Sequence, residues 1–262
     1  MNPRNRTIVG LLSAALLLSA ALPLYADEAL DKAFEALRAY DWGDDRGPLR
    51  PIDDAVAAAG NDADAAKELE AKLSAVLGED VSRAAKDYAC RQLSLVGTAA
   101  SVPALAALLP DEKLSHMARY ALERIPADEA AAAMRAALAE TDGLVKVGIV
   151  NSLGARRDKA GVGELAGLSA DSDPQIAAAA VAALGAIGTV EAAEALGSML
   201  DEAPDALKHH AAHAYLLCAE RLLADGHRMP AMTIYRKLAA AELPRHIKVA
   251  ATRGMLSAAG KQ

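Results

Sequence analysis

The chain has 262 residues, of which 53% are hydrophobic, about a quarter are alanine and only eight are aromatic, and its formal net charge is −7. The small number of aromatic side chains excludes a carbohydrate-binding groove and a surface that binds single-stranded nucleic acid, because both need aromatic faces for stacking. It also argues against a β-sandwich. A net acidic chain also does not favour nucleic acid, which requires clustered Lys and Arg. Since alanine is the strongest helix former, we predict an all-α protein that does not bind nucleic acid.

The N-terminal segment has the pattern of a secretory signal peptide over residues 1–26. Two arginines near the start precede an apolar run at 8–22 that contains no charge, and this order is typical of signal peptides. We predict cleavage after Ala26, a periplasmic or secreted location, and no membrane span in the mature chain. Because Leu24 is not the small residue expected three positions before the cut, an uncleaved N-terminal anchor is the alternative.

Residues 27–79 predict an N-terminal helical cap. An amphipathic helix is expected over 28–40, and two further helices near 51–59 and 62–77. Between the first two lies a turn with three aspartates around Trp42. Their spacing differs from that of a calcium-binding loop, so we interpret the segment as an acidic turn anchored by the tryptophan.

Internal repetition over residues 80–203 is the main signal in the sequence. Leucines at the i+8 position of an apolar stripe of i, i+4, i+8, i+11 spacing recur at intervals of 29, 31 and 31 residues, and a second apolar residue follows each leucine by twelve positions. The leucines are Leu93, Leu122, Leu153 and Leu184, and the second set is Leu105, Met134, Leu165 and Leu196. The stripe is the buried face of a helix, and only Arg156 interrupts it. Units of two short helices bury their apolar faces by stacking, so we predict a solenoid.

The repeat resembles a known family. Asp173-Pro174-Gln-Ile and the alanine-rich helix up to Gly188 are similar to the short HEAT repeat of bacterial exported proteins and of phycobilisome-lyase subunits, and residues 97–111 are similar to its other half. The resemblance implies an alpha-alpha superhelix of the HEAT/armadillo-like type. The family usually has a basic residue at a position where this chain keeps only Lys146, so a continuous Asp–Arg ladder along the repeats is not expected.

Residues 204–262 predict a different C-terminal pair and one last helix. Two helices joined at Gly226 look like a tetratricopeptide hairpin. The helix expected over 245–258 carries several apolar residues but no polar capping repeat follows it. We therefore expect its outer face to be a docking surface.

The two cysteines are predicted to be free. An exported protein invites a disulfide interpretation of Cys90 and Cys218. However, a bridge needs Cα atoms within about 7 Å, and the several helix pairs between these residues each add on the order of 10 Å. Both are therefore expected to be small buried apolar residues.

Histidines supply the only metal candidates, and they are weak ones. His209 and His213 lie one helical turn apart, but the zincin signature needs a glutamate where this chain has His210. Solvated or capping histidines are the preferred interpretation. The glycines around 161–167 resemble a phosphate loop only faintly, because they follow a helix instead of a strand. We predict no cofactor.

A compact basic turn supplies the candidate partner-binding residues, which are Arg156, Arg157 and Lys159, together with Lys146. The preferred interpretation of the turn itself is a helix C-terminus stabilised by positive charge, and an anionic docking site is the alternative. Since no catalytic constellation is found, we expect a non-catalytic exported scaffold for a protein partner that the sequence does not identify. Two alternatives stay open: a phycobilin-lyase-like role, which the resemblance implies, and an accessory or regulatory domain of a larger exported enzyme.

Overall fold

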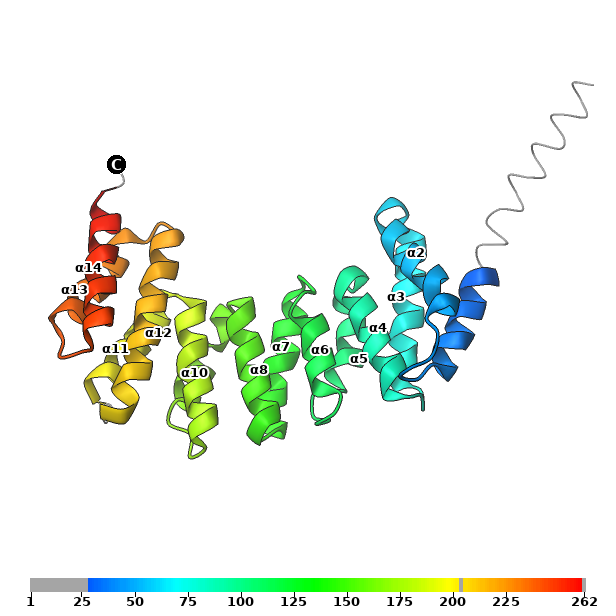
Figure 1. Ribbon diagram of the computed structural model, residues 1–262, viewed down its shortest axis with the longest axis horizontal. Helices are drawn as coiled ribbons and strands as arrows, with labels where there is room; N and C mark the ends of the chain where they lie inside the picture. The colour runs from blue at the N-terminus through cyan, green and yellow to red at the C-terminus, as the bar shows by residue number, and fades with distance from the viewer. Residues whose placement is uncertain (1–27, 203–204, 261–262) are drawn as a thin grey trace, which may run out of the picture. The chain divides into compact units, whose positions relative to one another are not determined.

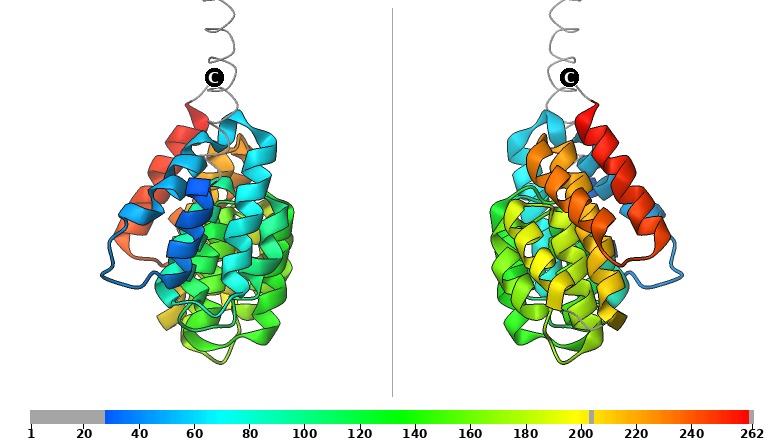
Figure 2. Two further views of the ribbon diagram at one scale, coloured as in Figure 1. Left: turned by 90° about the vertical axis from the view of Figure 1, so that its right-hand side faces the viewer. Right: turned by 90° about the vertical axis from the view of Figure 1, so that its left-hand side faces the viewer.

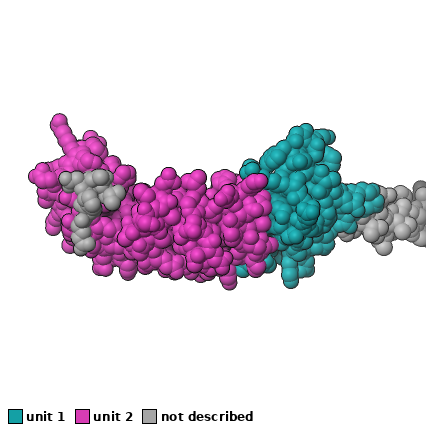
Figure 3. Space-filling model, turned by 90° about the horizontal axis from the view of Figure 1, so that it is seen from below, with its two compact units in different colours: residues 1–101 teal, residues 102–262 magenta. Residues whose placement is uncertain are grey.

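The computed structural model describes residues 28–202 and 205–260. Within these ranges all regular secondary structure is helical, and no strand occurs. The chain divides into two compact units, Met1–Ser101 and Val102–Gln262 (Figure 3). The predicted signal peptide lies outside the described residues, and none of the described helices is long and apolar enough to span a bilayer. The predicted domain boundaries after residues 79 and 203 stay predictions. The division between the two compact units follows Ser101, inside the segment predicted to contain the repeats.

From residue 28 onward, the first unit contains four α-helices, close to those predicted. They are 28–39, α2 (Arg50–Ala58), α3 (Ala63–Gly78) and α4 (Arg83–Val96), and a short 3-10 turn precedes α2. Side chains set the helix starts, since the Asp62 carboxylate accepts backbone N–H groups at the start of α3 and the Ser82 hydroxyl accepts one at the start of α4. The buried Glu70 carboxylate accepts the backbone N–H groups of Thr98 and Ser101 at 2.6 and 3.1 Å, which fixes the turn after α4.

The second unit is an all-α solenoid. Its helices are α5 (Val102–Ala106), α6 (Ser115–Leu122), α7 (Asp128–Ala137), α8 (Gly143–Arg156), α9 (Val162–Leu168), α10 (Pro174–Ile187), α11 (Val190–Glu202), α12 (Asp205–Ala224), α13 (Arg228–Ala240) and α14 (Arg245–Ala259). They follow one another in chain order (Figure 1). One row consists of α6, α8, α10 and α12, each in contact with the next, and α9, α11 and α13 form a second row.

The predicted repeat register is confirmed. The four key leucines and the four residues twelve positions later all have an exposed fraction of 0%. Helix α10 shows how the sequence sets the ends of a repeat helix. The Asp173 carboxylate accepts the Gln175 N–H at 2.8 Å, Pro174 occupies the first turn, and Gly188 ends the helix in the left-handed conformation with φ 66°. Aspartate, proline and glycine are favoured at these three positions.

Adjacent helices of the solenoid touch through pairs of small residues. A Cβ added to Gly154 in α8 would lie 2.9 Å from the Ala183 Cα atom in α10, and one added to Gly185 in α10 would lie 2.6 Å from the Ala214 carbonyl oxygen in α12. The second pair repeats the first, because Gly185 follows Gly154 by 31 residues and Ala214 follows Ala183 by 31 residues. The alanine-rich composition therefore has a packing role, because it lets the backbones of neighbouring repeats come close together.

The C-terminal helices agree with the predicted hairpin and last helix. Gly226, with φ 88°, lies in the turn between α12 and α13, and α14 packs on both of these helices. The right-hand view of Figure 2 shows α13 and α14 in front. In α14, Ile247 is buried in the core, whereas Val249 and Leu256 are 42% and 69% exposed.

Cys90 and Cys218 are both free and buried, as predicted. Burial raises the pKa of each thiol to about 12, so both thiols are protonated at neutral pH. They pack as small apolar groups, one in each unit.

Candidate functional site

The predicted basic turn lies at the end of α8 and borders a hollow. Arg156 is the last residue of the helix, and Arg157 adopts the left-handed conformation with φ 55° and ψ 47°. It is the one non-glycine residue with positive φ in the described part of the chain. The hollow has a volume of about 470 Å³, and both arginines line it together with Arg135, Asp158 and Lys159.

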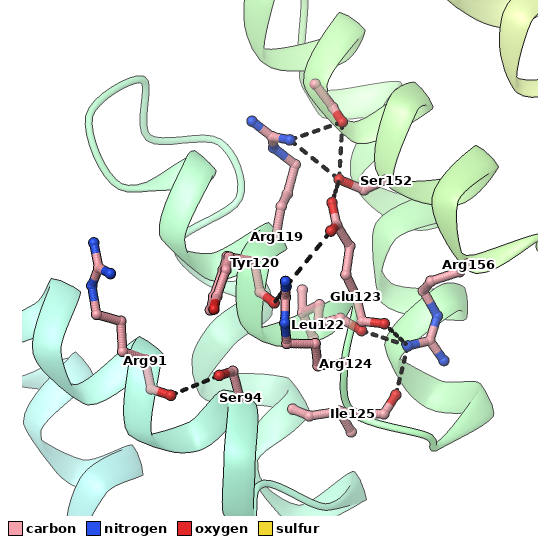
Figure 4. Close-up of polar contacts among 11 residues, drawn as sticks. Arg91, Ser94, Arg119, Tyr120, Leu122, Glu123, Arg124, Ile125, Ser152 and Arg156 are labelled. Carbon is pink, nitrogen blue, oxygen red and sulfur yellow. Dashed lines mark hydrogen bonds and ion pairs between the residues drawn. The ribbon is translucent and has the colours of Figure 1, made fainter.

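Arg156 binds the preceding repeat. Its guanidinium donates hydrogen bonds to the carbonyl oxygens of Leu122 at 2.6 Å, Ile125 at 2.5 Å and Glu123 at 3.2 Å (Figure 4). It also donates to the Ala127 carbonyl oxygen at 3.0 Å. These carbonyls lie at and after the end of α6, where backbone acceptors have no partner within the helix. The residue that interrupts the apolar stripe is therefore a cap for the neighbouring repeat. Partial burial lowers the pKa of Arg156.

Arg157 binds the following repeats. Its Nε atom donates to the Ile187 carbonyl oxygen at 3.0 Å, and its terminal nitrogens form a two-point ion pair with the Asp225 carboxylate, the shorter contact being 2.5 Å. This pair raises the pKa of Arg157 and lowers that of Asp225. Arg156 and Arg157 thus extend in opposite directions and connect the turn after α8 with the turns after α6, α10 and α12.

Of the other predicted partner-binding residues, Lys146 pairs with Asp142 at 3.2 Å within the start of α8. Lys159 is exposed beside the hollow, and the nearby Asp158 accepts a hydrogen bond from Arg135 at 2.6 Å. The partner-binding role of this turn stays a prediction. The structure adds an inter-repeat role for Arg156 and Arg157 that sequence reasoning missed.

A second polar cluster joins α6 to α8. The Arg119 guanidinium donates to the Gly148 carbonyl at 3.0 Å and to the Ser152 hydroxyl at 3.2 Å, and that hydroxyl also donates to the Glu123 carboxylate at 2.6 Å (Figure 4). Burial lowers the pKa of Arg119, and its Nε atom has no partner among the described residues. The signal in the sequence is a pair of charged residues four apart, Arg119 in α6 and Glu123 directly after it, matched by a pair of small residues four apart on α8.

Helix α14 borders two grooves that carry unpaired positive charge. The grooves have volumes of about 880 and 560 Å³ and share Val249 and Arg253 in their linings. We define the α14 cationic surface as the four basic residues that line them, Arg228, Arg245, Lys248 and Arg253. Within the described residues, none of the four forms an ion pair, and Glu220 is the one acidic residue in either lining.

The histidines are arranged differently from the predicted pair. His209 and His213 are both exposed on α12, but the structure places His213 against His246 of α14, with 3.4 Å between their Nε2 atoms. Sequence reasoning missed His246 because it lies 33 positions away on another helix. The described residues contain no group of three or more His, Cys, Asp or Glu side chains that could hold a metal ion.

The acidic turn of the first unit is a local structure. The carboxylates of Asp41, Asp44 and Asp45 accept backbone N–H groups within the turn at 2.8–2.9 Å, which agrees with the preferred interpretation. Trp42, however, is 62% exposed. The expectation that Trp42 anchors the turn is wrong, because the aspartate carboxylates hold the backbone of the turn and the tryptophan side chain does not.

Comparisons with known proteins identify the class. The family model described as HEAT repeats matches residues 136–215, the part of the chain that runs from α7 into α12. The match indicates HEAT repeats over these residues, in agreement with the two rows of stacked helices in the second unit.

Two solved structures are similar to the chain. The archaeal HEAT-like repeats protein from Thermococcus onnurineus NA1 is 15% identical, with a TM-score of 0.48, over 89% of this chain and 96% of that one. An engineered protein is 19% identical, with a TM-score of 0.39, over 79% and 96% of the two chains. A search of curated proteins gives no match.

Proposed function

We propose that the protein is a non-catalytic, exported HEAT-repeat scaffold, and that its α14 cationic surface binds an acidic surface of another protein. The observation that carries this proposal is the set of four unpaired cations lining two adjoining grooves. The HEAT-repeat solenoid supports it as well, since stacked repeats present extended surfaces suited to binding other macromolecules.

The charges of α14 favour an acidic partner. No acidic residue occurs from Arg245 to Ala259, while Arg245, His246, Lys248 and Arg253 all lie in this helix. Opposite charge across an interface accelerates association and selects among partners. The exposed side chain of Val249 lies between the two grooves and would supply the apolar centre that such interfaces contain.

The basic turn after α8 is the less favourable docking site. Arg156 and Arg157 already donate to protein acceptors, so a partner would have to displace these contacts before it could use either guanidinium. No such cost arises at Lys248 or Arg253, which makes α14 the preferred surface.

The test compares two charge-reversed variants with a matched control. The partner is first captured from an envelope extract on the wild-type protein, identified, and prepared in pure form. We expect Lys248→Glu and Arg253→Glu combined to weaken its binding at least tenfold, and wild-type binding to weaken as salt is raised. Arg236→Glu, an exposed charge reversal on α13 outside both grooves, should leave binding unchanged.

Two results would contradict the proposal. Equal binding by the double variant and the wild type would remove α14 from the interface, and loss of binding in Lys159→Glu alone would move the site to the basic turn. A purified protein that recovers no partner and instead binds a bilin, seen as visible absorbance, would favour the lyase-like role.

The proposed export has its own test. Fractionation of the source cells followed by mass spectrometry should find a mature chain that begins at Asp27 in the periplasm or the medium. An uncleaved chain in the membrane fraction would support the N-terminal anchor, and an uncleaved chain in the cytoplasm would contradict export.

A further inference from the structure

We propose that His213 and His246 form a zinc-binding pair that connects α12 to α14. The two Nε2 atoms are 3.4 Å apart, the ring centroids are 5.3 Å apart, and the ring planes differ by 26°. The two residues come from different helices, so the arrangement results from the packing of α14 on α12. This inference does not depend on the proposed partner or on the α14 cationic surface.

The distance between the nitrogens distinguishes two interpretations. In the first, one imidazole donates a hydrogen bond to the other; this bond would be a long one, since N–H donors usually lie about 2.7–3.2 Å from an oxygen acceptor and the two nitrogens are 3.4 Å apart. In the second, both nitrogens present lone pairs to one ion. Two Zn–N bonds of about 2.05 Å at a tetrahedral angle place the nitrogens about 3.3 Å apart.

The ring positions fit the same ion. If each Zn–N line is extended back through its ring, the ring centres in a tetrahedral site lie about 5.2 Å apart, close to the 5.3 Å in the structure. The small angle between the planes allows both lone pairs to lie near a common plane with the ion. The two separations therefore agree with those of two imidazoles bound to one tetrahedral ion.

The separation also agrees better with zinc than with metals that bind imidazole at right angles. Neighbouring ligands of square-planar copper(II) or octahedral nickel(II) meet at right angles, which would bring the two nitrogens to about 2.8–3.0 Å. The observed separation is larger and corresponds to a tetrahedral ion. Both histidines are exposed, so the two remaining coordination positions are accessible to water or to a third ligand.

The experiment is a zinc titration of the full chain prepared without a histidine tag and freed of metal with a chelator. We expect one Zn²⁺ per chain, with affinity reduced at least tenfold in His213→Ala and in His246→Ala, since even the outer partners of metal ligands affect affinity by about 10–100-fold. His210→Ala is the matched control, because His210 is exposed on α12 beside the predicted pair, and it should bind like wild type.

Two further measurements report the geometry and the link between helices. Cobalt(II) added to wild-type protein should give the intense visible absorption of a tetrahedral site, and His246→Ala should lose it. Zinc should raise the Tm of the wild type, because it binds the folded state, and this rise should be lost in His246→Ala, whose circular dichroism should match that of the wild type.

The outcome in His246→Ala decides the question. Unchanged zinc affinity in this variant, with loss in His209→Ala and His213→Ala, would place the ion between two residues of α12 and overturn the proposal. Failure of the wild-type chain to bind zinc would overturn it as well.

Discussion

Two adjacent arginines do more for the solenoid than their position in the sequence indicates. In the repeat pattern Arg156 is only an interruption of the apolar stripe. In the structure it donates to carbonyls at the end of α6, while Arg157 donates to Ile187 and Asp225. A guanidinium has five donors in a planar fork, so one side chain can satisfy several acceptors that a helix end leaves without partners.

We expect Arg156→Ala to lower the free energy of unfolding by about 2–3 kcal/mol, because hydrogen bonds from a charged donor are lost and partly buried carbonyls become unpaired. Lys159→Ala removes a positive charge from the same turn but no such contact, and it should change stability by less than about 0.5 kcal/mol. Urea unfolding followed by circular dichroism measures both. Equal effects of the two substitutions would show that Arg156 acts only through its charge.

The Arg157–Asp225 pair makes a pH-dependent contribution. Arg157 lowers the pKa of Asp225 below its unfolded value, so the stabilisation is complete above about pH 4 and is lost as pH falls through the folded-state pKa. Asp225→Asn should therefore be less stable than wild type at pH 7, and the difference should disappear toward pH 2. Urea unfolding across this range is the measurement. A difference that stays constant with pH would mean that the pair is not responsible.

At the scale of helices, the many small residues of this chain allow neighbouring helices to approach each other closely. The pairs Gly154–Ala183 and Gly185–Ala214 bring consecutive helices of one row into backbone contact. A glycine inside a helix costs up to about 1 kcal/mol relative to alanine. Glycine at these two positions is explained by packing, because even a methyl group would collide with the neighbouring backbone.

We expect Gly185→Ala to destabilise the protein by about 1–3 kcal/mol through overpacking, although alanine has the higher helix propensity. Gly167→Ala in α9 is the matched control. A Cβ there meets nothing within 4 Å, so this substitution should be neutral or stabilising by up to about 1 kcal/mol. Thermal unfolding of both variants gives the comparison. Stabilisation by both would show that α10 can move away from α12 at no cost.

At the scale of the whole molecule, each unit carries one buried thiol. Cys90 reports on the first unit and Cys218 on the second, and burial raises the pKa of both to about 12. We predict that neither reacts with a thiol reagent at pH 7 in the folded protein and that both react in denaturant, since the thiolate is the reacting form. A count of two thiols after denaturation without reductant would verify that no bridge forms. A count of zero would contradict the structure.

The regular part of the molecule could be predicted from the sequence, and the contacts between repeats could not. The burial of Leu153 and Leu184 is predictable because it depends on helical spacing, which is a local property. The partners of Arg156 and the pairing of His213 with His246 depend on how helices about 30 positions apart face each other. The sequence has no local sign of that alignment, and Trp42 shows that a large apolar residue can still lie at the surface.

The recurrence of the glycine–alanine contact limits how the chain can change in length. One residue inserted in α10 before Gly185 would rotate the remainder of the helix by about 100° around its axis and turn the glycine away from Ala214. An insertion or deletion of 31 residues would instead place an equivalent glycine opposite an equivalent alanine. We therefore expect this solenoid to tolerate gain or loss of a complete repeat better than the gain or loss of a single residue within a helix.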